Sequence, residues 1–114
     1  MSDSIYKERI PCSNGQDIRC NVIDIEVYYD LGGYNYFSGS EKKRGYYLSV
    51  SPLEVDGHFV SYQGFSGMYM LLNECSRKSK KAESEALKLM EEKKDVLISA
   101  VCNKHGIELI KKTA

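Results

Sequence analysis

The sequence has no tryptophan, only two prolines and no long apolar segment. No run approaches the roughly 18 consecutive apolar residues of a membrane-spanning helix, so an α-helical membrane protein is not indicated. The first eight residues also lack the apolar stretch of a secretory signal. We therefore expect a cytoplasmic protein without a membrane partner.

Recognisable motifs for metal binding and catalysis are missing as well. The cysteines form no CxxC pair, and neither histidine stands at a zinc-ligand spacing from them. No glycine-rich phosphate loop, HExxH, GxSxG or Cys/His pair occurs. We expect no catalytic residue, no metal site and no cofactor. We also expect free thiols at Cys12, Cys20, Cys75 and Cys102. The one locally feasible disulfide is Cys12–Cys20.

Net charge is absent too, because 16 Lys and Arg residues balance 16 Asp and Glu residues. Residues 1–65 hold 6 basic against 9 acidic residues, a charge of −3, whereas residues 66–114 hold 10 against 7, a charge of +3. This modest asymmetry argues against a nucleic-acid binder that acts through bulk charge. It leaves room for a local basic patch.

What the chain does contain is enough apolar sequence for one hydrophobic core. Its 114 residues are near the usual size of a single domain, and 42% of them are hydrophobic. Residues 1–17 end in the turn signals Pro11 and Ser13-Asn14-Gly15 and are expected to form an N-terminal arm, with the option of a short edge strand at Ile5-Tyr6. Residues 18–114 are expected to form one α+β domain.

Alternation marks the first strong strand. In the run from Ile18 to Leu31, apolar residues at odd positions alternate with mostly polar residues at even positions over residues 22–31. This period of two predicts a half-buried strand with its odd side chains inward. Gly32-Gly33 then favours a reversal into residues 34–37, a short strand or an ordered loop. Residues 38–44 are polar and predict an exposed loop.

Residues 45–65 predict a β-hairpin. Two runs rich in Tyr, Val, Leu and Phe flank Asp56-Gly57, a pair that supplies the positive-φ positions of a two-residue type I′ turn. A turn at these residues places Val55 opposite His58. With the preceding strand, the hairpin gives an antiparallel meander of three to four strands with one wet face and one covered face.

The hydrophobic period then changes. Apolar residues fall at helical spacing over residues 68–75 and again over residues 86–101. The polar segment 76–81 lies between them, so we expect two helices, or one with a marked bend, over residues 66–105, with a single long helix as the alternative. Gly106 follows two basic residues and makes a strong helix stop. The expected fold class is α+β, with one or two C-terminal helices packed on one sheet face.

Cationic and aromatic residues meet at the entry of the hairpin. Phosphate contact combined with base stacking is how sheet-based modules bind single-stranded nucleic acid. The alternative is a solvated basic turn followed by core tyrosines. The candidate binding residues in this region are Lys42, Lys43, Arg44, Tyr34, Tyr36, Tyr46 and Tyr47.

Two further groups of surface residues are candidates. Tyr28 shares an outward strand face with three carboxylates and suggests an acidic-aromatic contact patch or a cation site, although core or scattered tyrosines are the alternative. The three carboxylates are Asp24, Glu26 and Asp30. A basic run suits phosphates or an acidic protein surface and is also typical of a solvated helix face; it consists of Arg77, Lys78, Lys80 and Lys81.

Five motifs between Tyr28 and Lys81 carry a resemblance that covers roughly residues 26–110. They are Tyr28-Tyr29-Asp30, Gly32-Gly33, Asn35-Tyr36-Phe37, Arg44-Gly45-Tyr46-Tyr47 and Ser76-Arg77-Lys78-Ser79-Lys80-Lys81. With these motifs the chain resembles a group of small uncharacterised proteins from phages and mobile genetic elements of gut Firmicutes. The resemblance brings no known activity or site residues. It implies a setting in which small non-enzymatic proteins bind DNA, or bind and inhibit a host defence protein as anti-CRISPR proteins do.

We therefore expect a small non-enzymatic binding or regulatory module. Its expected partner is nucleic acid or a nucleic-acid-associated protein, contacted through the basic-aromatic surface. The alternative is a protein–protein inhibitor of a host defence system, or a self-assembling component that forms a homo-oligomer through a tyrosine-rich face or a sheet edge.

Overall fold

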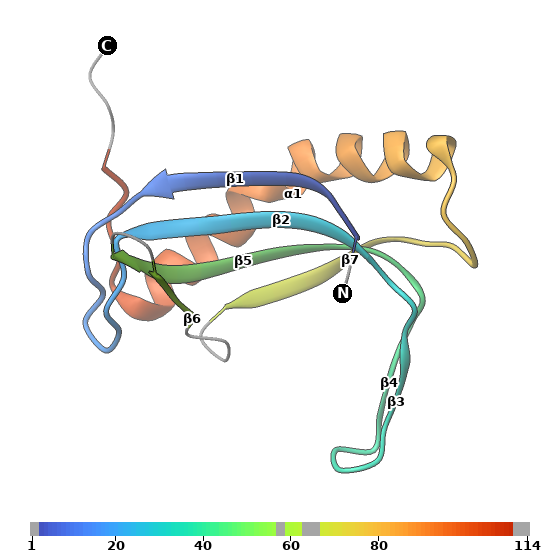
Figure 1. Cartoon of the computed structure of the whole chain (residues 1–114), viewed down its shortest axis with the longest axis horizontal. Coiled ribbons are helices and arrows are strands. Elements are labelled where there is room, and N and C mark those ends of the chain that lie inside the picture. The colour runs from blue at the N-terminus through green and yellow to red at the C-terminus, as the bar shows by residue number, and fades with distance from the viewer. Residues whose placement is uncertain (1–2, 57–58, 63–66, 111–114) are drawn as a thin grey trace.

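The computed structural model describes residues 3–56, 59–62 and 67–110. These residues form an antiparallel sheet with one long helix packed on one face, so the predicted α+β class is confirmed (Figure 1). The elements are, in chain order, β1 (Asp3–Pro11), β2 (Val22–Asp30), β3 (Gly33–Asn35), β4 (Ser40–Lys42), β5 (Gly45–Asp56), β6 (Phe59–Tyr62), β7 (Met68–Glu74) and α1 (Lys80–His105).

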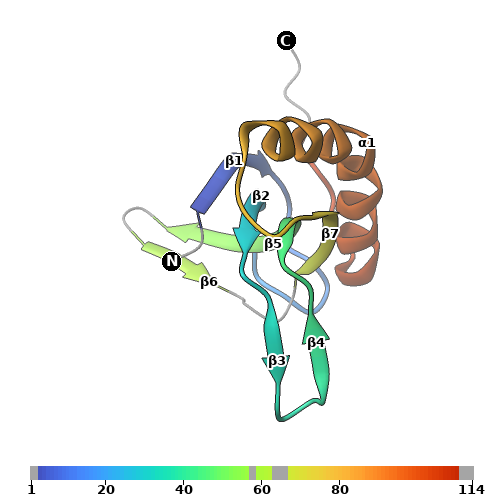
Figure 2. The same ribbon diagram turned by 90° about the vertical axis from the view of Figure 1, so that its right-hand side faces the viewer.

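The sheet is ordered β1-β2-β5, and the far edge of β5 is shared by β6 and β7. β7 pairs with the first half of β5, and β6 pairs with its last four residues. β3 and β4 pair with each other and project from the sheet (Figure 2). α1 packs against β2, β5 and β7 on what we call the helix face. The opposite side is called the open face, because no described helix covers it.

β2 shows the predicted alternation. Its odd-numbered residues, from Ile23 to Tyr29, are buried in the core on the helix face, and its even-numbered residues are half-buried on the open face. The strand ends at Asp30, which pairs with Gly45. The prediction that Leu31 points inward was wrong, because this residue lies past the last pair and is exposed.

The N-terminal segment, expected to be an arm with at most a short edge strand, forms the nine-residue strand β1. β1 pairs with β2 from Asp3 opposite Tyr29 to Pro11 opposite Val22, with a bulge after Ser4. Partly buried side chains of β1 pack against the core on the helix face. The segment is therefore the edge strand of the sheet over most of its length.

β5 and β6 form the predicted hairpin, but the predicted register was wrong. Val55 lies opposite Val60 rather than opposite His58. This register moves the connection one residue along the chain, from Asp56-Gly57 to residues 57–58, which lie outside the described residues. The backbone of Val55 is bonded to the side chain of Asn21 on the β2 side of β5, which helps to set this register.

Residues 68–74 form the strand β7, so the prediction of a helix in this segment was wrong. Met68 and Met70 pack towards the core, whereas Tyr69 between them is largely exposed. The apolar residues on both sides of this strand produce the helix-like spacing. Pairing with the free edge of β5 satisfies the backbone of the segment and overrides its local pattern.

One helix, α1, then covers the sheet. Ser79 caps its start, where the hydroxyl oxygen accepts a hydrogen bond from the Ala82 N–H at 3.1 Å. The predicted stop is confirmed: Gly106 has a φ of 65°, and its N–H donates to the Cys102 carbonyl. No helix among the described residues combines the length and the apolar character that crossing a membrane requires.

The segment after α1 closes the fold by binding the loop that follows β1. The Ser13 N–H donates to the Glu108 carbonyl at 2.8 Å, and the Ile110 N–H donates to the Pro11 carbonyl at 2.9 Å. A bridge between Cys12 and Leu109 lies between these bonds. The four cysteines have free thiols, and two of them lie close together, with 3.8 Å between the Sγ atoms of Cys12 and Cys20.

Candidate functional site

A two-stranded arm projects from the end of the sheet. β2 and β5 pair as far as Asp30 and Gly45, and the chain between them continues as the β3–β4 hairpin, called the arm below (residues 33–42). Gly32 permits this departure, because its φ is 74° and an added Cβ would lie 2.5 Å from the Lys42 carbonyl oxygen. Asp30 Oδ1 accepts a hydrogen bond from the Gly32 N–H at 2.7 Å. Figures 1 and 2 show the arm extending away from both the sheet and α1.

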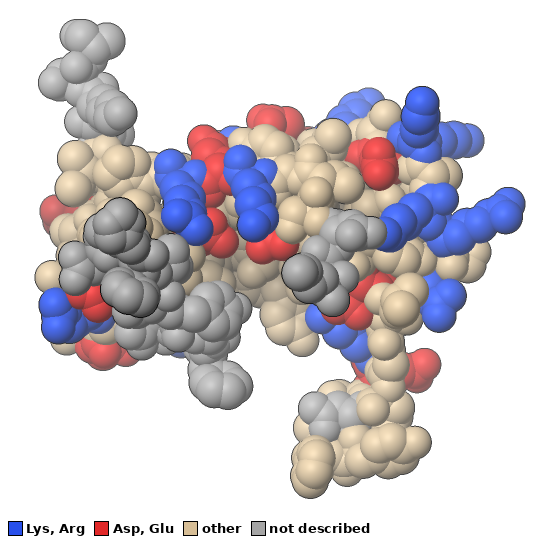
Figure 3. All heavy atoms as spheres, viewed as in Figure 1, with Lys and Arg blue, Asp and Glu red and all other residues tan. Residues whose placement is uncertain are grey.

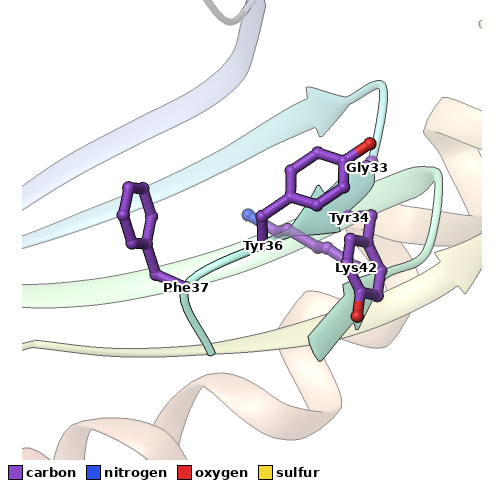
Figure 4. A pocket seen from close by; sticks show the side chains of 6 residues that line it. Gly33, Tyr34, Tyr36, Phe37 and Lys42 are labelled. Carbon is purple, nitrogen blue, oxygen red and sulfur yellow. The ribbon is translucent and has the colours of Figure 1, made fainter. Parts of the chain in front are cut away.

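The arm carries three exposed aromatic side chains. Tyr34, Tyr36 and Phe37 are 55%, 87% and 104% exposed. The rings of Tyr34 and Tyr36 meet edge to face with 5.0 Å between centroids, and Phe37 stands apart from them (Figure 4). The three rings line a shallow hollow together with Gly33 and Lys42. Clustered exposed aromatic side chains are typical of a contact surface.

Lys42, the only basic residue of the arm, turns back onto the open face of the sheet. Its Nζ lies 2.9 Å from Asp30 Oδ2 and 4.6, 4.7 and 5.6 Å from the ring centroids of Tyr47, Tyr69 and Tyr28. Burial alone would lower the pKa of Lys42, but the hydrogen bond to Asp30 and the negative charge nearby outweigh it and raise the pKa. We call the three rings the tyrosine cage.

The next two basic residues also make contacts within the chain. Arg44 Nε donates to the Leu31 carbonyl at 3.0 Å, and Arg44 Nη1 donates to the Ser76 carbonyl at 3.2 Å. Lys43 Nζ lies 3.7 Å from Glu74 Oε2 in an exposed ion pair. The expected basic turn is therefore a joint that connects the arm, the sheet and the loop after β7.

The second basic run lies beside this joint because β7 pairs with the start of β5. The Cys75 N–H donates to the Arg44 carbonyl at 3.1 Å, which brings the two basic segments to the same end of the molecule. Lys and Arg side chains gather at this end, on the right of Figure 3. We call it the basic end and define it by the exposed residues Lys43, Arg44, Arg77, Lys78, Lys80 and Lys81.

The cations at the start of α1 do not help the helix. A helix N-terminus carries a partial positive charge, so basic residues there are destabilising. Lys80 and Lys81 are the first two helical residues, and Glu83 is the only acidic residue of the first turn. A local arrangement that opposes stability is typical of a functional surface.

The tyrosines predicted to form one cluster lie in three different places. Tyr34 and Tyr36 are on the arm, and Tyr47 is a buried wall of the cage on the open face. Tyr46 is fully buried on the helix face, where its ring meets that of Tyr29 edge-on at 5.1 Å. For Tyr46 the alternative of a core tyrosine therefore holds.

Tyr69 and Asp30, which surround the Lys42 ammonium group, were absent from the predicted basic-aromatic site. Tyr69 was assigned to a helix, which concealed its alignment with Tyr28 and Tyr47 on the open face. Asp30 was predicted to belong to the acidic-aromatic patch on the outward face of its strand. No local pattern identifies Tyr69 as a cage residue, because the apolar residues of β7 lie on both faces of the strand. Its place beside Tyr28 and Tyr47 follows from the pairing of β7 with β5.

The proposed acidic patch on β2 is engaged by the neighbouring strand. Asp24 pairs with Arg9 at 3.2 Å, and Glu26 accepts a hydrogen bond from the Ser4 hydroxyl. In the described part of the chain, no three His, Cys, Asp or Glu side chains converge in a way that would hold a metal ion. The open face therefore carries charged and hydrogen-bonded pairs between β1 and β2, and aromatic side chains on β5 and β7.

Comparison of this chain with protein-family models, with curated proteins and with solved structures finds no match. The described features that bear on function are therefore the arm, the tyrosine cage and the basic end.

Proposed function

We propose that this protein is a non-enzymatic binding module that inserts its aromatic arm into a groove on a partner protein. The observation that supports this proposal is the exposure of Tyr34, Tyr36 and Phe37 on a hairpin that projects from the molecule. Side chains so exposed contribute little to the stability of their own fold. Aromatic anchors, in contrast, supply much of the binding energy at protein interfaces.

The arm suits an apolar groove with a polar rim. Burial of each aromatic side chain in such a groove contributes about 1.5–3 kcal/mol, and the tyrosine hydroxyls bring hydrogen-bonding groups to the rim. The only charged residues of the arm are Glu41 and Lys42, and Lys42 is turned back onto the sheet. The tip therefore fits a protein groove better than a phosphate backbone.

The basic end supplies a second contact beside the base of the arm. Its charge favours an acidic surface next to the groove of the partner and raises the rate of encounter with it. Because these side chains are exposed, their contribution is expected to weaken as ionic strength rises.

The resemblance to phage and mobile-element proteins directs the search for this partner. We propose that the partner is a protein that acts on nucleic acid. If this partner is a host defence protein, binding of the arm would inhibit it. An arm that fills a working groove blocks it, so binding alone is sufficient for inhibition and no catalytic group is required.

Single-stranded nucleic acid is the second candidate ligand, and the basic end is the observation that favours it. Bases stacked on Tyr36 or Phe37 would contribute about 1–3 kcal/mol each, and phosphates would lie at the basic end. Such binding would weaken steeply with salt, because each phosphate contact releases counterions.

Photo-crosslinking from the tip tests the proposal. A photoreactive phenylalanine analogue at position 37 is expected to give a discrete cross-linked protein in cells that contain the partner. The same analogue at position 96, an exposed position on α1, is the matched control and is expected to give none. Loss of the cross-link in Tyr36→Ser would tie it to the aromatic tip, and equal cross-linking from both positions would contradict the proposal.

Size-exclusion chromatography with light scattering separates the second candidate from the first. The protein is mixed at low salt with short single-stranded and duplex oligonucleotides. A complex that dissociates as salt rises, and that is lost in Lys80→Ala/Lys81→Ala, would make nucleic acid the ligand. An unshifted peak would favour a protein as the partner. The measured mass would then show whether that partner is a second copy of this chain.

A further inference from the structure

The rings of the tyrosine cage form a fixed wall on the open face. They come from three neighbouring strands, and the register places Tyr28 directly opposite Tyr47. The rings of Tyr28 and Tyr47 stack with 5.9 Å between centroids and 20° between planes. Tyr69 meets Tyr47 edge-on, also at 5.9 Å. Rings carried by paired strands are held in place before any ligand arrives, which lowers the entropic cost of binding.

The cage already holds one ammonium group. Lys42 Nζ lies within the reach of about 6 Å for cation–π attraction from all three ring centroids, and Asp30 supplies a carboxylate at 2.9 Å. Several aromatic faces with a carboxylate beside them are the surroundings that recognise alkylammonium ligands. The lysine belongs to the arm, whereas the rings belong to the sheet. Ligand and site thus lie on two parts of the chain that meet at Gly32.

We propose that the tyrosine cage and Asp30 form a binding site for alkylammonium groups, which Lys42 occupies from within the chain and which an external amine or lysine side chain enters when Lys42 leaves. This inference goes beyond the proposed function and does not depend on what the arm tip binds. Lys42 competes as a tethered ligand, with an effective concentration on the order of millimolar. An external ligand therefore binds the unaltered protein more weakly than a protein without Lys42.

Occupation of the cage from outside is coupled to the arm. The contact of Lys42 with the cage ties the end of β4 to the sheet, and its displacement removes this tie at the base of the arm. The coupling is reciprocal: a partner that draws the arm away from the sheet opens the cage, and a cage ligand makes the arm easier to draw away.

The variant Lys42→Ala tests the proposal, because it empties the cage and leaves the rings and Asp30 in place. We expect n-butylammonium chloride to shift the NMR signals of the cage tyrosines to saturation, with a midpoint at least fivefold lower in the variant than in the unaltered protein. n-Butanol, which is uncharged, and sodium chloride at equal ionic strength are expected to give no saturating shift. Equal midpoints in the two proteins, or an equal response to n-butanol, would overturn the proposal.

Two further variants and a second probe locate the site and its ligand. In the Lys42→Ala protein, Tyr69→Leu is expected to raise the midpoint at least threefold, because Tyr69 is a cage wall yet 61% exposed. Tyr36→Leu removes an exposed tyrosine outside the cage and is expected to leave the midpoint unchanged; a rise as large as that from Tyr69→Leu would overturn the assignment. Tighter binding of N-acetyl-lysine amide than of n-butylammonium would identify a peptide lysine as the natural source, and the reverse would identify a free amine.

The unaltered protein provides a measurement that does not require a folded variant. After reductive methylation of the lysines with 13C-formaldehyde, the methyl signal of Lys42 is expected to lie upfield of the others because of the surrounding rings. Titration with n-butylammonium is expected to move this signal to the position of the exposed lysines. A Lys42 signal that does not move up to the solubility limit of n-butylammonium chloride would overturn the proposed exchange.

Discussion

The side-chain amide of Asn21 forms two hydrogen bonds with the backbone of Val55. Nδ2 donates to the Val55 carbonyl at 2.8 Å, and Oδ1 accepts from the Val55 N–H at 2.9 Å. Since β2 begins at Val22, this amide extends the hydrogen-bond pattern of the strand by one position. The two bonds hold the far end of β5 in place just before the hairpin connection, and so help to fix the register of that hairpin.

We expect Asn21→Ala to lower the free energy of unfolding by about 1 kcal/mol, because it removes two hydrogen bonds at an exposed position. The measurement is denaturant unfolding, in which the midpoint should fall and the slope should stay the same. The matched control is Asn103→Ala on the exposed side of α1, where alanine favours the helix. An equal loss of stability in both variants would show that the bonds to Val55 contribute nothing specific.

Two tyrosines of very different exposure give the second prediction. Tyr46 is fully buried, so Tyr46→Ala leaves a cavity and is expected to cost about 3–5 kcal/mol of stability. Tyr36 lies on the arm, and Tyr36→Ala is expected to change stability by less than about 0.5 kcal/mol. Thermal unfolding of the two variants checks the contrast. A large loss in Tyr36→Ala would mean that the arm is part of the core of the protein.

The ion pair between Asp30 and Lys42 predicts a loss of stability at both extremes of pH. Burial alone would raise the pKa of Asp30, but the hydrogen bonds from Lys42 and Gly32 outweigh it and lower the pKa. A lowered pKa in the folded state gives stability that is complete above the ordinary value of about 3.9 and is lost as pH falls through the folded value. The raised pKa of Lys42 gives stability that is complete below about 10.4 and is lost as pH rises.

The test is the free energy of unfolding as a function of pH for the unaltered protein and for Asp30→Asn. Both groups are about one-third exposed, so the pair is expected to contribute less than about 1 kcal/mol at neutral pH. The difference between the two proteins should shrink as the solution is acidified. Curves that stay parallel down to acid pH would contradict the assigned role of Asp30.

Cys12 is expected to be unreactive while the protein is folded. Burial, followed by the hydrogen bond and charge of Cys20, raises the pKa of Cys12 to about 12. The thiolate is the reactive form, so iodoacetamide at about pH 8 should modify this residue only after unfolding. Peptide mass spectrometry of native and denatured samples measures the difference. Equal modification in both samples would contradict the burial of Cys12.

The parts of the fold that follow from local patterns were predictable. The alternation of β2 and the stop of α1 at Gly106 each depend on residues within one element. β7 was not predictable in this way, because its apolar residues lie on both faces and its conformation is decided by the free edge of β5. The hairpin register likewise depends on Asn21, which lies far from the hairpin in sequence.

For the candidate site, the sequence indicated which residues take part but not how they are arranged. Lys42 and the tyrosines around it stood out as a group of cations and aromatic residues. Their arrangement depends on the kink at Gly32, which sends the aromatic tip outwards and returns Lys42 to the sheet. The same kink separates the exposed rings from the cation that was expected to act beside them.

The bonds that join residues 107–110 to the segment after β1 have a consequence for how the protein is made. A ribosome releases the chain from its N-terminus, so β1 and β2 emerge long before the residues that complete their far end. Until residues 107–110 leave the exit tunnel, the backbone on either side of Cys12 lacks its hydrogen-bond partners, the Glu108 carbonyl and the Ile110 N–H. The last closure spans almost the whole chain and is therefore slow. We expect the nascent chain to reach its native state only after these residues have been synthesised and released.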